Sequence, residues 1–299
     1  MSRRGWVLFL AMGVIWGVPY LMIKVAVGAM TPASLVFWRT AIATLLLLPI
    51  AAARGQLRPL LPRWRPLLVY TVAELAVPWL LLSSAEQRLS SSLTGLLMAA
   101  IPLVGATLAW VTGGDRLGPR RLLGLVIGLA GVASLVGLDL GGGDVPALIA
   151  LGVVTIGYAV GPYVLARHLS GAPRLGVVAA SLALTSLGYL PAGLVQLPGH
   201  WPAARVLGAV LVLAVLCTSV AFLLFFALID EVGPVRATVI TYINPAVAVA
   251  LGVLLLDEPF TAGIGIGFAL VLAGSVLATR RSPARRATAV TPEVEVGVG

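Results

Sequence analysis

The chain has 299 residues, of which 60% are hydrophobic and only 10% are charged, with a mean hydropathy of +1.06. A soluble protein would carry about a quarter charged residues, so lipid must surround most of this chain. The formal net charge of +9 indicates basic cytoplasmic loops rather than a nucleic-acid partner. With one cysteine, Cys217, and two histidines at segment ends, a disulfide framework is excluded and no metal site is expected.

Apolar stretches of about 18 to 24 residues alternate with short polar clusters along the chain. At about 1.5 Å per residue, each stretch crosses a hydrocarbon core of roughly 30 Å as a helix. Only a helix satisfies its own backbone in lipid, so the predicted fold class is all-α, a polytopic membrane protein with ten transmembrane helices. The predicted spans cover residues 5–27, 35–53, 66–84, 92–112, 120–138, 145–166, 175–197, 206–229, 235–256 and 262–279.

The two ends of the chain carry different signals. Arg3 and Arg4 precede an apolar run that resembles a signal peptide, but the run continues to Val27 without a cleavage pattern and is interpreted as the first span. Lysines and arginines gather in the loops on the side of the N-terminus, which predicts cytoplasmic N- and C-termini in a bacterial-type plasma (inner) membrane. Residues 282–299 have no apolar face to bury and are predicted to form a disordered cytoplasmic tail.

An internal duplication becomes visible when the chain is laid on itself so that Pro19 falls on Pro162. We call this alignment the repeat alignment. Without gaps, it also pairs Tyr20 with Tyr163, Lys24 with Arg167, Pro102 with Pro245, Asp115 with Glu258 and Gly124 with Gly267. These matches predict a first repeat over residues 1–140 and a second over 141–281, each with five helices. Because five is odd, the second repeat must cross the membrane upside down relative to the first, as in many secondary transporters.

Motifs along nearly the whole chain resemble one family of transporters. They are the stretch from Trp16-Gly17 to Lys24, Arg39 in the second span, the small residues before Pro102, Asn244-Pro245 and Asp257-Glu258-Pro259. Their order resembles the drug/metabolite transporter superfamily, specifically its EamA-type members with two five-helix repeats. The resemblance implies an exporter of amino acids, other metabolites or toxic compounds. It also implies that spans one to four and six to nine surround a central cavity, with spans five and ten outside.

Two prolines and an asparagine are candidates for lining that cavity. Pro102 and Pro245 lie near the middle of spans four and nine, so the duplication places two helix breaks at the same depth. Each proline frees a backbone carbonyl, which favours either a polar cavity or a permanent packing kink. Asn244 is expected either to bind substrate through its amide or to satisfy the carbonyl that Pro245 frees.

Charged side chains inside the spans are candidates for coupling and gating. Glu74 lies near the centre of span three, where an unpaired charge costs on the order of 3 kcal/mol or more, so it must be protonated, paired or facing water. It is expected either to bind a proton or a cation during transport or to make a structural hydrogen bond. Lys24 and Arg167 are expected either to reach the headgroups or to act as gates or carboxylate contacts. Arg39, at the outer end of span two, has the same two alternatives, and a role as an interfacial anchor is favoured over a role as a ligand.

Aromatic side chains are candidates for the wall of a substrate pocket, although tryptophan and tyrosine are equally expected in interfacial belts. Together with the residues above, they give a predicted substrate site. Its members are Trp16, Tyr20, Glu74, Trp79, Pro102, Tyr158, Tyr163, Tyr242, Asn244 and Pro245.

The predicted function is secondary active transport. The expected direction is export, and the expected substrates are small metabolites, such as amino acids, or toxic organic solutes. A gradient-driven facilitator or channel with the same architecture is the alternative, and the sequence does not separate the two. An enzyme is not expected, because no ATP-binding loop, G-x-S-x-G or H-E-x-x-H motif occurs. The expected partners are a small-molecule substrate, the lipid bilayer and, if Glu74 couples transport, protons. No cofactor is expected, and the chain is predicted to be a monomer or homodimer.

Overall fold

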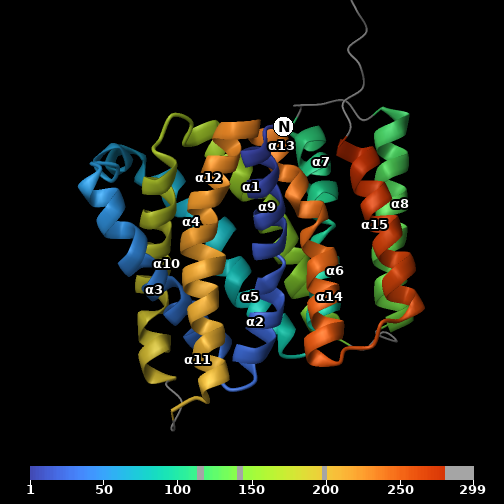
Figure 1. The fold of residues 1–299 in the computed structure, drawn as a ribbon. Coiled ribbons are helices and arrows are strands. Elements are labelled where there is room, and N and C mark those ends of the chain that lie inside the picture. Colours follow the sequence, from blue (N-terminus) through green and yellow to red (C-terminus); the bar gives the residue numbers. More distant parts are fainter. Residues whose placement is uncertain (113–117, 140–143, 197–200, 280–299) are drawn as a thin grey trace, which may run out of the picture.

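The computed structural model describes residues 1–112, 118–139, 144–196 and 201–279, and every regular element in them is a helix. The helices stand side by side in one bundle (Figure 1). Within the described residues, nine helices are long and apolar enough to cross a membrane, and a further 21-residue helix, α8, packs against one of them, α15. The prediction of an all-α polytopic fold is therefore confirmed. The predicted boundary between the repeats, at residues 140–141, and the predicted tail at 282–299 lie outside the described residues.

In the described part of the chain, ten helical spans follow one another, several of them built from shorter pieces. The first five are α1 (Arg3–Ile15) with α2 (Val18–Val27); α3 (Pro32–Ala53); η1 (Arg58–Arg63), α4 (Trp64–Thr71), η2 (Val72–Ala76) and α5 (Val77–Glu86); α6 (Ser91–Met98) with α7 (Ile101–Val111); and α8 (Pro119–Asp139). The second five are α9 (Val145–His168); α10 (Arg174–Val195); α11 (Ala204–Leu211), η3 (Val212–Val220) and α12 (Ala221–Val232); α13 (Pro234–Ala237), η4 (Thr238–Tyr242) and α14 (Asn244–Leu256); and α15 (Ala262–Thr279).

Spans four and nine are interrupted directly before their central prolines, as the duplication predicts. Pro102 lies in the first turn of α7 and Pro245 in the first turn of α14. A proline in a first turn has no amide hydrogen to leave unsatisfied, so each break begins a new helix without the loss of a hydrogen bond. The first span also breaks, at Trp16-Gly17, whereas Pro162 lies inside the continuous helix α9.

Spans three and eight each contain a stretch of wider π-helix, which the sequence analysis did not predict. The repeat alignment carries η2 onto residues 215–219, inside η3. In η3, the hydroxyl groups of Thr218 and Ser219 donate hydrogen bonds to the carbonyl oxygens of Leu213 and Ala214, at 2.7 and 2.9 Å. Such bulges are frequent at functional sites because they change the direction of the side chains on a helix.

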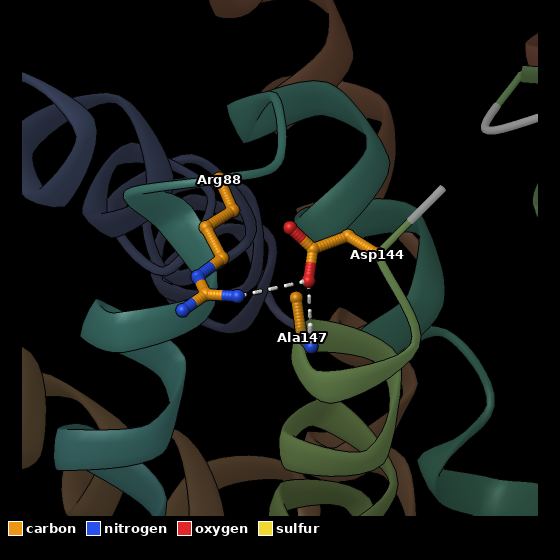
Figure 2. A network of polar contacts seen from close by, with 3 residues as sticks. All are labelled: Arg88, Asp144 and Ala147. Carbon is orange, nitrogen blue, oxygen red and sulfur yellow. Dashed lines mark hydrogen bonds and ion pairs between the residues drawn. The ribbon is translucent and has the colours of Figure 1, made fainter. Parts of the chain in front are cut away.

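Polar contacts at one end of the bundle bring the start of the second repeat beside the end of span one. Lys24, near the end of α2, donates to the carbonyl oxygens of Glu86 and Leu89, both at 2.7 Å. The neighbouring Arg88 pairs with Asp144 at 3.4 Å, and Asp144 caps the start of α9 through the amide of Ala147 (Figure 2). Span six therefore begins where span one finishes. We call this the distal end, and the end that holds the N-terminus the proximal end.

Glycines bring α8 and α15 into backbone contact at the side of the bundle (Figure 1). A Cβ atom added at Gly274 would lie 2.5 Å from the Cα atom of Gly128 and 2.6 Å from the carbonyl oxygen of Gly124. Since helix association in lipid depends on close packing, these glycines set the distance between the two helices.

We predict that Gly274→Leu pushes α8 and α15 apart, because no space exists for a side chain at this position. The expected loss of stability is about 1–3 kcal/mol, the usual cost of overpacking. Thermal unfolding of the purified protein in detergent measures it. Gly188→Leu is the matched control, since a Cβ atom there would meet nothing within 4 Å. Equal effects of the two substitutions would contradict the prediction.

Candidate functional site

Arg39 lies in the interior of the bundle, where it is only 7% exposed. Its guanidinium group stacks on the ring of Trp79, 3.6 Å from the ring centroid, and its Nε atom donates to the hydroxyl of Thr218 at 3.0 Å. The interpretation of Arg39 as an interfacial anchor is therefore wrong. The helix α3 starts at Pro32, so Arg39 lies two turns inside the span, and the π-helix η3 supplies the hydroxyl that holds it there.

Two of the predicted pocket tyrosines lie around the same arginine. Tyr20, Tyr158, Cys217 and Glu86 are the titratable groups that lie within electrostatic range of Arg39. Five spans, the first, second, third, sixth and eighth, thus contribute a side chain. We call Arg39, Trp79, Thr218, Tyr20 and Tyr158 the arginine cluster.

Glu74 lies beside this cluster, in the π-helix η2. Its carboxyl group packs against Gly161 of α9, where any Cβ atom would overlap it. Its Oε2 atom is buried without a hydrogen-bond partner in the described part of the chain, and Tyr158 of the cluster lies within its electrostatic range. Glu74 was expected to be protonated, paired or facing water. Among the described residues, it forms no ion pair.

Three other predicted pocket aromatics point elsewhere. Trp16 packs edge-on against Phe222, 6.0 Å between ring centroids, and Tyr163 accepts a hydrogen bond from Arg167 of its own helix at 3.1 Å. The hydroxyl of Tyr242 lies 3.0 Å from the hydroxyl of Thr279 on α15. The structure does not bring these side chains to the arginine cluster.

Asn244 connects the break in span nine with the first span. With its amide nitrogen facing two acceptors, it donates to the carbonyl oxygens of Ile240 at 3.0 Å and Gly13 at 2.9 Å. Both amide hydrogens are then used on backbone carbonyls around the helix break. This geometry favours the structural alternative for Asn244 over a substrate contact.

Lys24 binds the end of another helix rather than reaching toward the headgroups. Its two bonds, to the carbonyl oxygens of Glu86 and Leu89, close the C-terminal end of α5. The last carbonyls of a helix carry partial negative charge, so a partly buried ammonium group is well placed there.

Glu258 closes the N-terminal end of the next helix, α6, from the second repeat. Its two carboxylate oxygens accept from the amides of Ser91 at 2.7 Å and Ser92 at 2.9 Å, and from the Ser92 hydroxyl at 2.5 Å. The left-handed residue Asp257, with a φ of 55°, turns the chain back to this position. Gly252 leaves room for the carboxylate between α14 and α6. We call Lys24 and Glu258, with the helix ends they bind, the distal clamp.

Glu86 is a buried acidic residue that the sequence analysis missed. It is 0% exposed, and neither of its carboxyl oxygens has a hydrogen-bond partner among the described residues. Lys24, Glu258 and Arg39 lie within its electrostatic range, so it lies between the distal clamp and the arginine cluster. The predicted third span ended at residue 84, just too early to include it.

The comparisons with known proteins agree with a duplicated transporter fold. The EamA-like transporter family matches residues 3–137 and again residues 145–280. The chain belongs to the EamA-like transporter family. Members of the EamA-like family are multi-pass membrane transporters and not enzymes, so this chain is a membrane transporter.

Relatives of this EamA chain match it over most of its length. The uncharacterized transporter YvbV of Bacillus subtilis (strain 168) is 23% identical over 93% of this chain and 92% of its own. The uncharacterized inner membrane transporter YedA of Escherichia coli (strain K12) is 29% identical over 81% of this chain and 79% of its own. A solved crystal structure superposes with a TM-score of 0.67 over 93% of this chain and 97% of the other, at 23% identity, which supports the fold.

We predict that Gly161→Ala displaces Glu74, because the new methyl group would occupy the position of its carboxyl group. The expected loss of stability is about 1–3 kcal/mol, measured by thermal unfolding in detergent. Glu74→Ala in the same chain should restore most of it. Gly152→Ala, on the same helix with nothing within 4 Å of the new atom, is the control. A loss that persists in the double variant would contradict this account.

Proposed function

We propose that this EamA-family chain is a secondary active transporter that exports small metabolites, such as amino acids, or toxic organic solutes by alternating access. The observation that carries the proposal is an asymmetry between the two ends of a duplicated bundle. At the distal end, α6 packs on α14 and Lys24 binds the end of α5, whereas the repeat equivalents of these two contacts at the proximal end are not made among the described residues. In an inverted repeat, exchanging these two arrangements turns a central site from one side of the membrane to the other.

Helix packing is the first part of this asymmetry. At the distal end, α6 packs along α14 and also contacts α2. The repeat alignment carries α6 onto α13 with η4, and carries α14 onto residues 101–113, which include α7. In the part of the chain that the structure describes, α7 makes no comparable contact with α13 or η4. The packing thus favours a state closed at the distal end.

Lys24 and Arg167, which the repeat alignment pairs, show the second part of the asymmetry. Lys24 is bound to the end of α5, whereas Arg167 donates to Tyr163, one turn earlier in its own helix. The counterparts of Glu86 and Leu89 are Ile229 and Val232, at the end of α12. We propose that Arg167 binds this helix end in the opposite state, in which Lys24 is released.

The proposed orientation follows from the basic residues and from the relatives. The positive-inside pattern favours cytoplasmic termini, and YedA is named an inner membrane transporter. The distal end then faces the periplasm, and the structure corresponds to a state closed on that side, in which an exporter would load its cargo.

Proton entry would supply enough energy for export. One proton entering through about 100 mV releases about 2.3 kcal/mol, which supports a gradient of roughly 40-fold for a neutral solute.

We predict that Lys24→Gln opens the distal end. Losing the charge-assisted bonds to the end of α5 should raise the population of the opposite state about tenfold. The reporter is Thr94→Cys, a buried site one turn into α6, in a chain whose only cysteine is replaced by Cys217→Ser. Labelling of intact cells with a membrane-impermeant maleimide should increase.

Arg167→Gln is the matched control for this labelling, because the bond that its side chain makes lies within its own helix. It should not increase the labelling of the cysteine at position 94. Equal labelling in both variants would argue against the distal clamp and against the alternating state it represents.

We predict that Glu74→Gln weakens proton-driven efflux, because an amide cannot release a proton. Efflux of a panel of metabolites and toxins from proteoliposomes, with and without an imposed proton gradient, measures this. Proton-dependent efflux at the wild-type rate in the variant would remove Glu74 from the mechanism. Wild-type flux that ignores the proton gradient would instead favour the facilitator alternative.

A further inference from the structure

We infer that Arg39 is the binding site for a carboxylate group of the transported solute. The inference rests on the proposed transport function and gives it a substrate class: small organic acids that carry one carboxylate, amino acids included.

Arg39 has unused hydrogen-bond donors at its terminal nitrogens. A guanidinium group carries five N–H donors, and the Nε donor is used on Thr218. In the part of the chain that the structure describes, no protein group accepts a hydrogen bond from the two terminal nitrogens, and no carboxylate lies within ion-pair distance of them. A charge that is only 7% exposed inside a membrane bundle needs a partner.

Two contacts hold the guanidinium group of Arg39 in place. Trp79 stacks on its flat face and Thr218 binds its Nε atom, so its plane and position are fixed by two different helices. The outer edge, with the two terminal nitrogens, is the part left without a partner among the described residues. This edge matches the two oxygens of a carboxylate in a planar, bidentate arrangement.

The surroundings of Arg39 favour a ligand with a single negative charge. The other basic side chain of the distal interior, Lys24, is already bound to two carbonyl oxygens. A single arginine balances one negative charge, which favours a carboxylate over a doubly charged phosphate. Tyr20 and Tyr158 lie within the electrostatic range of Arg39 and provide hydroxyl groups on otherwise aromatic surfaces. Such surroundings suit an organic acid with an apolar body.

The test compares matched ligands on the purified full-length protein in detergent, with the unfolding temperature as the readout. One series is hydrocinnamate, phenylalanine and phenethylamine, and a second is isocaproate, leucine and isoamylamine. At millimolar concentrations, the acids and amino acids should stabilise the wild-type protein, whereas the two amines, which lack the carboxylate, should not. Arg39→Gln should weaken the apparent affinity for the acids at least about tenfold.

Two further variants keep the result interpretable. Arg39→Lys keeps the charge but loses the planar fork, so stabilisation by the acids should be reduced and not abolished. Arg65→Gln removes an exposed arginine that lies over Trp64, at 5.3 Å, and should leave the response unchanged. Stabilisation by the amines alone, an undiminished response in Arg39→Gln, or no response to any acid would overturn the inference. None of these results touches the labelling change expected at the distal end, so failure here is distinguishable from failure of the transport proposal.

Discussion

Inside a membrane bundle, every backbone group that leaves the helical hydrogen-bond pattern needs a partner from the protein. The short turn between α5 and α6 shows how this chain meets that requirement. Lys24 of the first repeat binds the carbonyls at the end of α5, and Glu258 of the second repeat binds the amides at the start of α6. Because one partner comes from each repeat, satisfying this turn also joins the two halves of the bundle. A structural need at a helix end thereby becomes a contact that must change if the halves move.

The interior depends on the same constraint. Thr218 both satisfies a carbonyl of the π-helix and receives the Nε donor of Arg39, so one hydroxyl group serves the irregular backbone and the buried charge. In the π-helix of span three, Glu74 occupies the space that Gly161 leaves open. The two π-helices therefore bring Glu74 and Thr218 to the candidate site, beside the buried Arg39 of the regular helix α3.

The large-scale fold could be read from the sequence because its signals are local. Apolar length predicts spans, and the matching prolines predict the breaks before Pro102 and Pro245. The candidate site was less predictable, because burial depends on how distant helices meet. Arg39 looks like an end residue until Trp79 and Thr218 are brought to it from spans three and eight. Glu86 was missed because it ends its helix, and no local pattern shows that other spans cover that end.

The repeats share the breaks before Pro102 and Pro245 and the π-helices of spans three and eight, but they differ in their chemistry. The repeat alignment pairs Arg39 with Leu182, Glu74 with Cys217 and Trp79 with Phe222. These breaks and π-helices occur in both halves, as the proposed alternating mechanism requires. Arg39 and Glu74, in contrast, have the uncharged counterparts Leu182 and Cys217 in the second half. The proposed binding of one unsymmetrical solute between the repeats needs only one such set of partners. In this proposal, duplication supplies the movement, and divergence between the halves supplies the recognition.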